Sequence, residues 1–251
     1  MSTYALARKE IEPEPLAPLA FLSGVKGYSR DSAREFLRAQ PGFLGRNLQL
    51  EAARELSAAA GLAGFETMLI KETELPAAPH PIEPDMIEPK DGGFQARAGG
   101  ALTFIPYDSI TNFSAAAFDA PAAVDNIQAL ESGLFERIAR FAGARVPPVP
   151  APRRDTFFRA DLISGEERLR LLLKPEKLDF SPLGPARSPA SQINFRSLLG
   201  TLAAHCPKAA KNAFLRAFLA GGPLTPLKIA STEAADAELS RLLLLAPKLK
   251  G

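Results

Sequence analysis

The sequence predicts an α+β protein, in which a small strand-helix-helix-strand module is followed by a larger domain of antiparallel strands with a helical C-terminal part. Three observations lead to this prediction. Residues 16–75 alternate short apolar runs with apolar residues at helical spacing. Residues 91–173 contain two pairs of apolar segments joined by turn-forming residues. Roughly the last 60 residues repeat apolar side chains every three or four positions.

The chain begins with a segment that lacks apolar periodicity. Residues 1–15 are rich in glutamate and proline, so we expect a flexible arm. The module at residues 16–75 then opens with an apolar run, Leu19–Val25, which we interpret as a strand. Ser29 can cap the N-terminus of a helix, and Pro41 forbids its continuation.

The second half of the module repeats this pattern in reverse. Asn47 is a suitable N-cap for a second helix, which Gly61 ends. The segment Phe65–Lys71 predicts a strand, because Met68, Leu69 and Ile70 form a short buried run. In outline the unit resembles the small α/β sandwiches of regulatory proteins and of the ribosomal stalk.

A proline-rich stretch divides the chain. Residues 76–90 contain repeated prolines, which disfavour helix and predict an extended connector. Residues 91–251 form the larger domain. It opens with a hairpin signal, because the pair Gly99-Gly100 separates Gly93–Ala98 from Ala101–Ile105.

The middle of the larger domain predicts strands around one helix. Ile110–Phe118 is a further strand, and Asn126–Ala142 is an amphipathic helix. The tract 146–152 has polyproline character and is a spacer or a ligand for an aromatic groove. A second hairpin joins Thr156–Ile163 to Arg168–Leu173 through a Ser-Gly turn.

The C-terminal residues predict three helices with separate apolar faces. Proline and glycine separate them at Pro207 and at the Gly221-Gly222-Pro223 turn. In the last helix, the four leucines 242–245 surround most of a turn. We therefore expect this helix to be buried on more than one side, by its own domain or by a partner subunit.

Charge and cysteine content narrow the classes of protein. The formal net charge is +2, but residues 151–251 carry 16 basic and 9 acidic side chains. The single cysteine, Cys206, excludes an intramolecular disulfide and is typical of a reducing compartment. The N-terminus lacks the apolar core of a signal peptide, and no apolar run approaches the roughly 20 residues that span a bilayer. We expect a soluble cytoplasmic protein without membrane contact.

Residues typical of catalysis or metal binding are scarce. Only His80, His205 and Cys206 are soft or borderline metal donors, so we expect no metal, and no motif for a cofactor occurs. His80 is predicted to be a surface residue of the connector. Neighbouring side chains on a helix point about 100° apart, so His205 and Cys206 are not expected to form a catalytic pair. Asp108, Asp161 and Glu166 are candidates for a carboxylate site that has no sequence signature.

The strongest candidate interaction surface is basic. Lys208, Lys211 and Arg216 are predicted to share one face of the penultimate helix, with Arg196 on the helix before it. The leading hypothesis is a non-enzymatic binding, scaffolding or regulatory protein that contacts a protein partner or a second copy of itself. The alternatives are an enzyme with a carboxylate-based or lysine-based site, and a nucleic-acid-binding protein that uses the basic C-terminal third.

Overall fold

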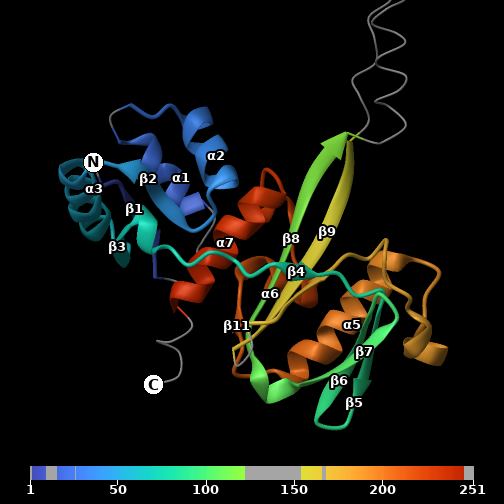
Figure 1. Cartoon of the computed structure of the whole chain (residues 1–251). Coiled ribbons are helices and arrows are strands. Elements are labelled where there is room, and N and C mark those ends of the chain that lie inside the picture. Colours follow the sequence, from blue (N-terminus) through green and yellow to red (C-terminus); the bar gives the residue numbers. More distant parts are fainter. Residues whose placement is uncertain (1, 10–15, 26, 122–153, 166–167, 246–251) are drawn as a thin grey trace, which may run out of the picture.

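A computed structural model describes residues 2–9, 16–25, 27–121, 154–165 and 168–245 (Figure 1). The predicted fold class is confirmed: the protein is α+β, with mainly antiparallel strands and a helical C-terminal part. The sequence-predicted helix at 126–142 and the polyproline tract at 146–152 lie outside the described residues. Within the described residues, no helix has the length and apolar character needed to cross a membrane.

The N-terminal unit is a three-stranded antiparallel sheet with strand β1 at its centre. The strands are β1 (Tyr4–Arg8), β2 (Phe43–Leu48) and β3 (Thr67–Lys71), in the order β2-β1-β3. The prediction of a flexible arm over residues 1–15 is therefore wrong for residues 4–8. These residues are stabilised by pairing with strands that lie far away in sequence, which is a contact that local composition does not reveal.

Three helices accompany this sheet: α1 (Leu16–Ser23), α2 (Arg30–Ala39) and α3 (Leu50–Leu62). The strand predicted at 19–25 is wrong, because Leu19 and Leu22 are one helical turn apart and both are buried in α1. The helix predicted after Ser29 is confirmed, and Ser29 forms a capping box with Ser32.

Asn47 does not cap α3, as the sequence had predicted. It lies in β2 with a φ of 54°, a left-handed conformation that asparagine tolerates better than most residues. Its backbone N–H donates to Oε1 of Glu72 at 2.7 Å. The helix begins only at Leu50, and the strand predicted near Phe65–Lys71 is confirmed as β3.

The body of the protein is built on a long hairpin of two strands, β8 (Ile110–Pro121) and β9 (Arg154–Ser164). Strand β10 (Arg170–Leu173) pairs antiparallel with β9, which confirms the second predicted hairpin. Two short parallel strands complete the sheet in the order β11-β8-β9-β10-β4; they are β4 (Pro81–Ile82) and β11 (Ala210–Lys211).

A second, three-stranded antiparallel sheet packs beside this one. Its strands β5 (Met86–Lys90), β6 (Gly93–Ala98) and β7 (Ala101–Pro106) follow in order, and the Gly99-Gly100 turn predicted from the sequence joins the last two. The predicted connector at 76–90 is shorter than expected. The second half of the connector forms strands β4 and β5, which pair with β10 and β6 respectively.

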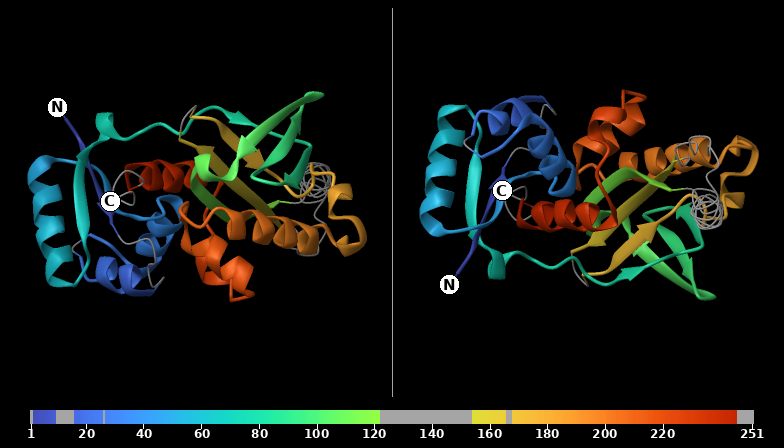
Figure 2. Two further views of the ribbon diagram at one scale, coloured as in Figure 1. Left: turned by 90° about the horizontal axis from the view of Figure 1, so that it is seen from below. Right: turned by 90° about the horizontal axis from the view of Figure 1, so that it is seen from above.

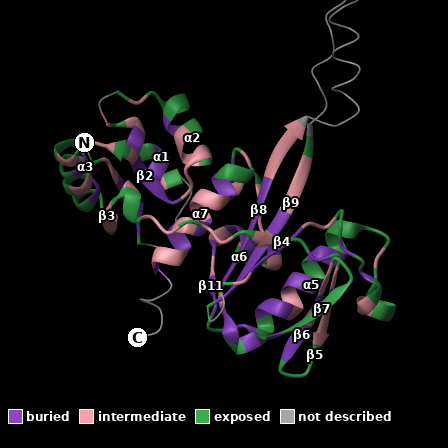
Figure 3. Cartoon of the chain, in the orientation of Figure 1, coloured by how far each residue is buried: buried purple, intermediate pink, exposed green. Residues whose placement is uncertain are grey.

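The C-terminal helices are α5 (Ser191–His205), α6 (Ala213–Ala220) and α7 (Thr232–Leu245). Helices α5 and α6 close a core between the two body sheets, with Phe195, Leu199 and Phe214 among its members. Buried residues gather along β8, β9 and the inner side of α5 (Figure 3).

Helix α7 lies between the N-terminal unit and the body (Figures 1 and 2). On one side, Ala234 and Ala235 pack with Ala116 of β8. On the other, Ala237 packs against Ala5 of β1 and its neighbours. The helix is thus buried on more than one side within the same chain, as the leucine-rich sequence predicted.

Candidate functional site

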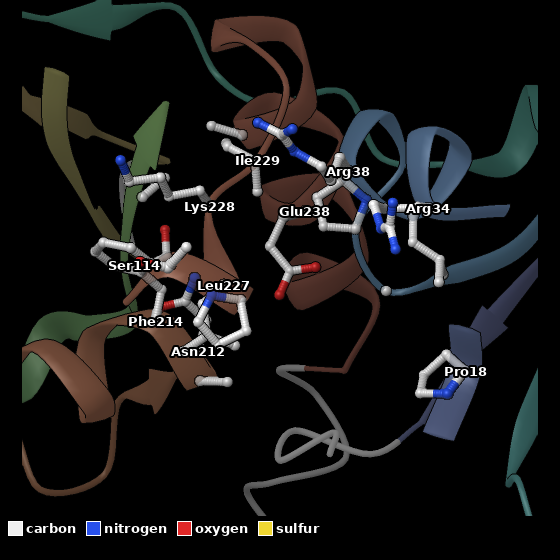
Figure 4. Close-up of a pocket in the computed structure, with 18 of the residues that line it drawn as sticks. Pro18, Arg34, Arg38, Ser114, Asn212, Phe214, Leu227, Lys228, Ile229 and Glu238 are labelled. Atoms are coloured by element: carbon white, nitrogen blue, oxygen red, sulfur yellow. The ribbon is translucent and has the colours of Figure 1, made fainter. Parts of the chain in front are cut away.

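The candidate site is a cleft between the N-terminal unit and the body, which we call the inter-unit cleft (Figure 4). Its volume is about 500 Å³, within the range of roughly 300 to 1,000 Å³ that is usual for ligand sites. One wall consists of α1, α2 and the end of β1, the other of β8, the start of α6 and the loop before α7, and Glu238 of α7 lies between them. The lining residues are Arg8, Leu16, Pro18, Leu19, Arg30, Arg34, Leu37, Arg38, Pro41, Gly42, Ser114, Ala115, Ala116, Asp119, Asp161, Asn212, Ala213, Phe214, Thr225, Pro226, Leu227, Lys228, Ile229, Ala235 and Glu238.

The wall formed by α2 is cationic. Arg30, Arg34 and Arg38 recur every four residues, so they lie along one side of the helix, and all three line the cleft. Arg34 pairs with Asp31 at 3.0 Å, but both side chains are exposed, and such a pair contributes only about 0 to 1 kcal/mol. In the described part of the chain, no carboxylate forms an ion pair with Arg30 or Arg38.

The facing wall mixes apolar and polar side chains. Phe214 and Leu227 lie on it with Asn212 and Lys228, across the cleft from Arg34, whereas Ile229 lies beside Arg38 (Figure 4). A structural hydrogen bond fixes the distance between the walls at one edge, because the backbone N–H of Ala230 donates to the carbonyl oxygen of Arg38 at 2.8 Å. The cleft therefore has an arginine-rich wall on α2 and a mixed wall on the body, where Phe214 and Ile229 are buried.

The first carboxylate that lines the cleft, Asp119, is neutralised by a lysine. Nζ of Lys228 lies 2.7 Å from its Oδ1, and Oγ1 of Thr156 donates to the same oxygen at 2.7 Å. These two hydrogen bonds hold the pKa of Asp119 below its ordinary value, so the carboxylate is ionised at neutral pH.

The second carboxylate, Asp161, belongs to a network of four charges, of which Asp161, Arg159 and Arg170 are buried and Asp236 is partly exposed. Arg159 donates to both of its oxygens, at 3.0 and 3.1 Å, and Nε of Arg170 donates to Oδ1 at 2.8 Å. Both arginines also donate to Oδ1 of Asp236 on α7. Burial would raise the pKa of Asp236, but the hydrogen bonds from the two arginines outweigh it and lower that pKa. The network is balanced, with two cations and two anions.

The third carboxylate, Glu238, is bound by the guanidinium of Arg241 at 2.9 and 2.8 Å. Arg241 is 1% exposed and also donates to the backbone oxygen of Arg8 at 3.0 Å. All three carboxylates that line the cleft are therefore paired with a cation of the same chain. The charge that is left over in the cleft is positive, and it is concentrated on α2.

The basic surface predicted from the sequence is arranged differently. Lys208 is exposed in a turn, Lys211 is half-buried in β11, and only Arg216 lies on α6. The prediction that they share a helical face is wrong, because Asn212 caps α6 by accepting from the backbone N–H of Leu215. The helix starts after the two lysines.

Two residues of that predicted surface bind carbonyl oxygens at helix ends. Arg196 donates to the carbonyl of Leu219 at 2.8 Å, and Lys211 donates to the carbonyl of Cys206, the C-cap of α5. Cations at such positions satisfy carbonyls that have no partner within the helix. The binding role of Arg196, Lys208, Lys211 and Arg216 stays a prediction, and the contacts of Arg196 and Lys211 are structural.

The remaining sequence candidates are dispersed. His205 is exposed and stacks on Tyr107 with ring centroids 4.6 Å apart, whereas Cys206 is buried. Burial raises the pKa of the Cys206 thiol to about 11, as in a packed thiol rather than a nucleophile. Asp108 and His80 are exposed, and Glu166 lies outside the described residues. Among the described residues, no group of three His, Cys, Asp or Glu side chains could hold a metal ion.

The sequence analysis did not predict the cleft, although one of its two walls has a pattern that the sequence shows. The four-residue spacing of Arg30, Arg34 and Arg38 predicts a cationic stripe on one helix. The facing wall includes residues 114–116, 213–214 and 225–229, which no local pattern connects with α2. No protein-family model, curated protein or solved structure matches the chain.

Proposed function

We propose that this chain is a non-enzymatic binding protein that acts through protein–protein contact, and that the inter-unit cleft holds an acidic segment of its partner. The observation that carries the proposal is the charge balance of the cleft. Its three carboxylates are paired within the chain, whereas no carboxylate of the described residues forms an ion pair with Arg30 or Arg38, although Arg38 attracts Asp119 from beyond ion-pair distance. A carboxylate from outside can pair with these arginines without displacing an internal partner.

Accessible apolar side chains support a protein ligand rather than an inorganic anion. Leu16 of α1, which is 62% exposed, and the partly buried Leu227 both line the cleft, and burial of their surface favours binding. An anion without apolar groups would leave these two side chains exposed to water. A polypeptide segment supplies both carboxylates and apolar side chains.

The experiment is a capture from nuclease-treated lysate of the native cell at physiological salt, followed by quantitative mass spectrometry. The bait proteins are the wild type, the cleft variant Arg30→Glu with Arg38→Glu, and a matched control, Arg54→Glu. Arg54 is an exposed arginine on α3 and does not line the cleft. We expect a stoichiometric protein that the wild type and the control retain and the cleft variant loses. Retention of the same proteins by all three baits would contradict the proposal.

A further inference from the structure

Strand β7 of the small sheet has an open side. The strand order β5-β6-β7 leaves it at one edge, and in the described part of the chain no strand pairs with its other side. The sheet lies on the far side of the body from the N-terminal unit (Figures 1 and 2). Proteins usually protect such an edge with charged residues, proline or a bulge. β7 has an unbroken register with β6, no charged residue, and proline only at its last position.

The register of the hairpin determines which backbone groups of β7 face outward. Both glycines of the Gly99-Gly100 turn have positive φ, 57° and 83°, which is typical of a two-residue turn whose flanking residues are hydrogen-bonded to each other. Bonded and non-bonded pairs then alternate along the hairpin. Leu102 lies opposite Arg97, whose carbonyl oxygen accepts from the N–H of Asp85 on the β5 side. The N–H and C=O groups of Leu102 and Phe104 therefore point to the open side.

The side chains of these two residues are apolar and accessible. Leu102 is 59% exposed and Phe104 is 50% exposed, and their even spacing places them on the same face of the sheet. The ring of Phe104 lies over Gly93, because a Cβ atom there would be 2.6 Å from Cζ of the ring. The glycine thus holds the ring against the sheet beside the open edge.

We infer that two copies of this chain associate by antiparallel pairing of their β7 strands about a two-fold axis at Thr103. Leu102 of each copy then lies opposite Phe104 of the other, and each outward N–H meets an outward C=O. The leucine and phenylalanine side chains pack together across the strands, and the two Thr103 side chains lie opposite each other, both of which are favourable pairs. The edge is thus complementary to itself in register and in side chains.

Charge and area also fit a second copy. Like charges directly opposite each other destabilise paired strands, and β7 has none. On the neighbouring strands, Arg97 is paired with Asp85 and Lys90 with Glu88, so two copies can approach without an unpaired charge from these residues. Residues 101–105 span only about 17 Å, so the area is small, below the roughly 1,200 Å² of a stable interface. We therefore expect a weak, reversible dimer.

The test is sedimentation velocity of the full chain from about 1 to about 500 µM, a range that covers weak association. We expect a reversible monomer–dimer equilibrium of the wild type. Thr103→Lys and Thr103→Glu should each raise the dissociation constant at least about tenfold, because each places two like charges at the two-fold axis. An equal mixture of these two variants should dimerise again. The control Ala59→Lys, at an exposed position of α3, should dimerise as the wild type does.

Three results would overturn the inference. A wild type that stays monomeric throughout would leave a strand of another protein as the alternative occupant of the edge. A dimer that both Thr103 variants retain would use another surface. Failure of their mixture to dimerise would exclude the two-fold pairing at Thr103. Because Thr103 is exposed, we expect both variants to fold, and a thermal unfolding curve checks this. Thr103 does not line the inter-unit cleft, so these results are independent of the lysate capture.

Discussion

Gly42 and Arg241 share a small space behind the inter-unit cleft. A Cβ atom on Gly42 would lie 1.9 Å from Nε of Arg241 and 2.7 Å from Oε2 of Glu238. Glycine is also suited to this position because its φ is 81°. The residue thus allows β2 to begin close to the buried ion pair of α7.

We predict that Gly42→Ala destabilises the protein more than the same substitution at Gly64. Gly64 has a similar φ of 85°, but an added Cβ there meets no atom within 4 Å. Gly64→Ala should cost about 1 kcal/mol, the penalty of a left-handed alanine, whereas Gly42→Ala should cost roughly 2 kcal/mol more through displacement of Arg241. Urea unfolding of the two variants measures the difference. Equal losses would show that Arg241 moves away without cost.

At the scale of elements, the structure shows which helices, strands and turns are determined by residues close together in the sequence. The N-cap at Ser29 and the turn at Gly99-Gly100 each depend on a few neighbouring residues, and the sequence predicted both correctly. The apolar run at residues 19–25 did not distinguish helix from strand, because a short apolar run fits either. Strands β1 and β11 depend on distant partners, so no local pattern predicted them.

The same distinction applies to the candidate site. A reader of the sequence could place three arginines on one side of a helix from their spacing alone. The pairing of Asp119 with Lys228 joins residues 109 positions apart. This pairing neutralises the carboxylate of Asp119, which would otherwise attract the arginines of α2 more strongly. The pairing is visible only in the folded structure.

Helix α7 is attached to the body sheet through its first turns. Asp236 accepts hydrogen bonds from Arg159 and Arg170, which hold its pKa below the ordinary value despite burial. A carboxyl group with a lowered pKa in the folded state stabilises the protein above its unfolded pKa of about 3.9, and this contribution is lost as the pH falls through the folded pKa.

We predict that Asp236→Asn reduces the acid sensitivity of the protein. At pH 7 the variant should be less stable by about 1 kcal/mol, a value kept small because the carboxylate side chain is 43% exposed. Below about pH 4 the difference from the wild type should shrink as Asp236 takes up a proton. Urea unfolding between pH 7 and pH 3 tests this, with the 91% exposed Asp31→Asn as control. A difference that stays constant over this range would contradict the prediction.

On the scale of the whole molecule, α7 determines how the N-terminal unit sits against the body. Its alanines pack on β8 and β1, and its Arg241 binds both Glu238 and the backbone of β1. The cleft lies between the two units that this helix joins. The shape of the cleft therefore depends on the buried pair in α7.

We predict that Arg241→Met loosens the N-terminal unit while the body remains folded. The substitution leaves the carboxylate of Glu238, 14% exposed, without its bidentate guanidinium partner, and breaking a buried pair in this way costs about 3 to 5 kcal/mol. Adding Glu238→Gln removes the uncompensated charge and should recover part of the loss. Hydrogen exchange measured by mass spectrometry should show faster exchange in β1 and β2 of Arg241→Met, little change in β8 and β9, and partial recovery in the double variant. Equal acceleration in the unit and the body would show that the pair stabilises the protein as one cooperative structure and does not specifically hold the N-terminal unit in place.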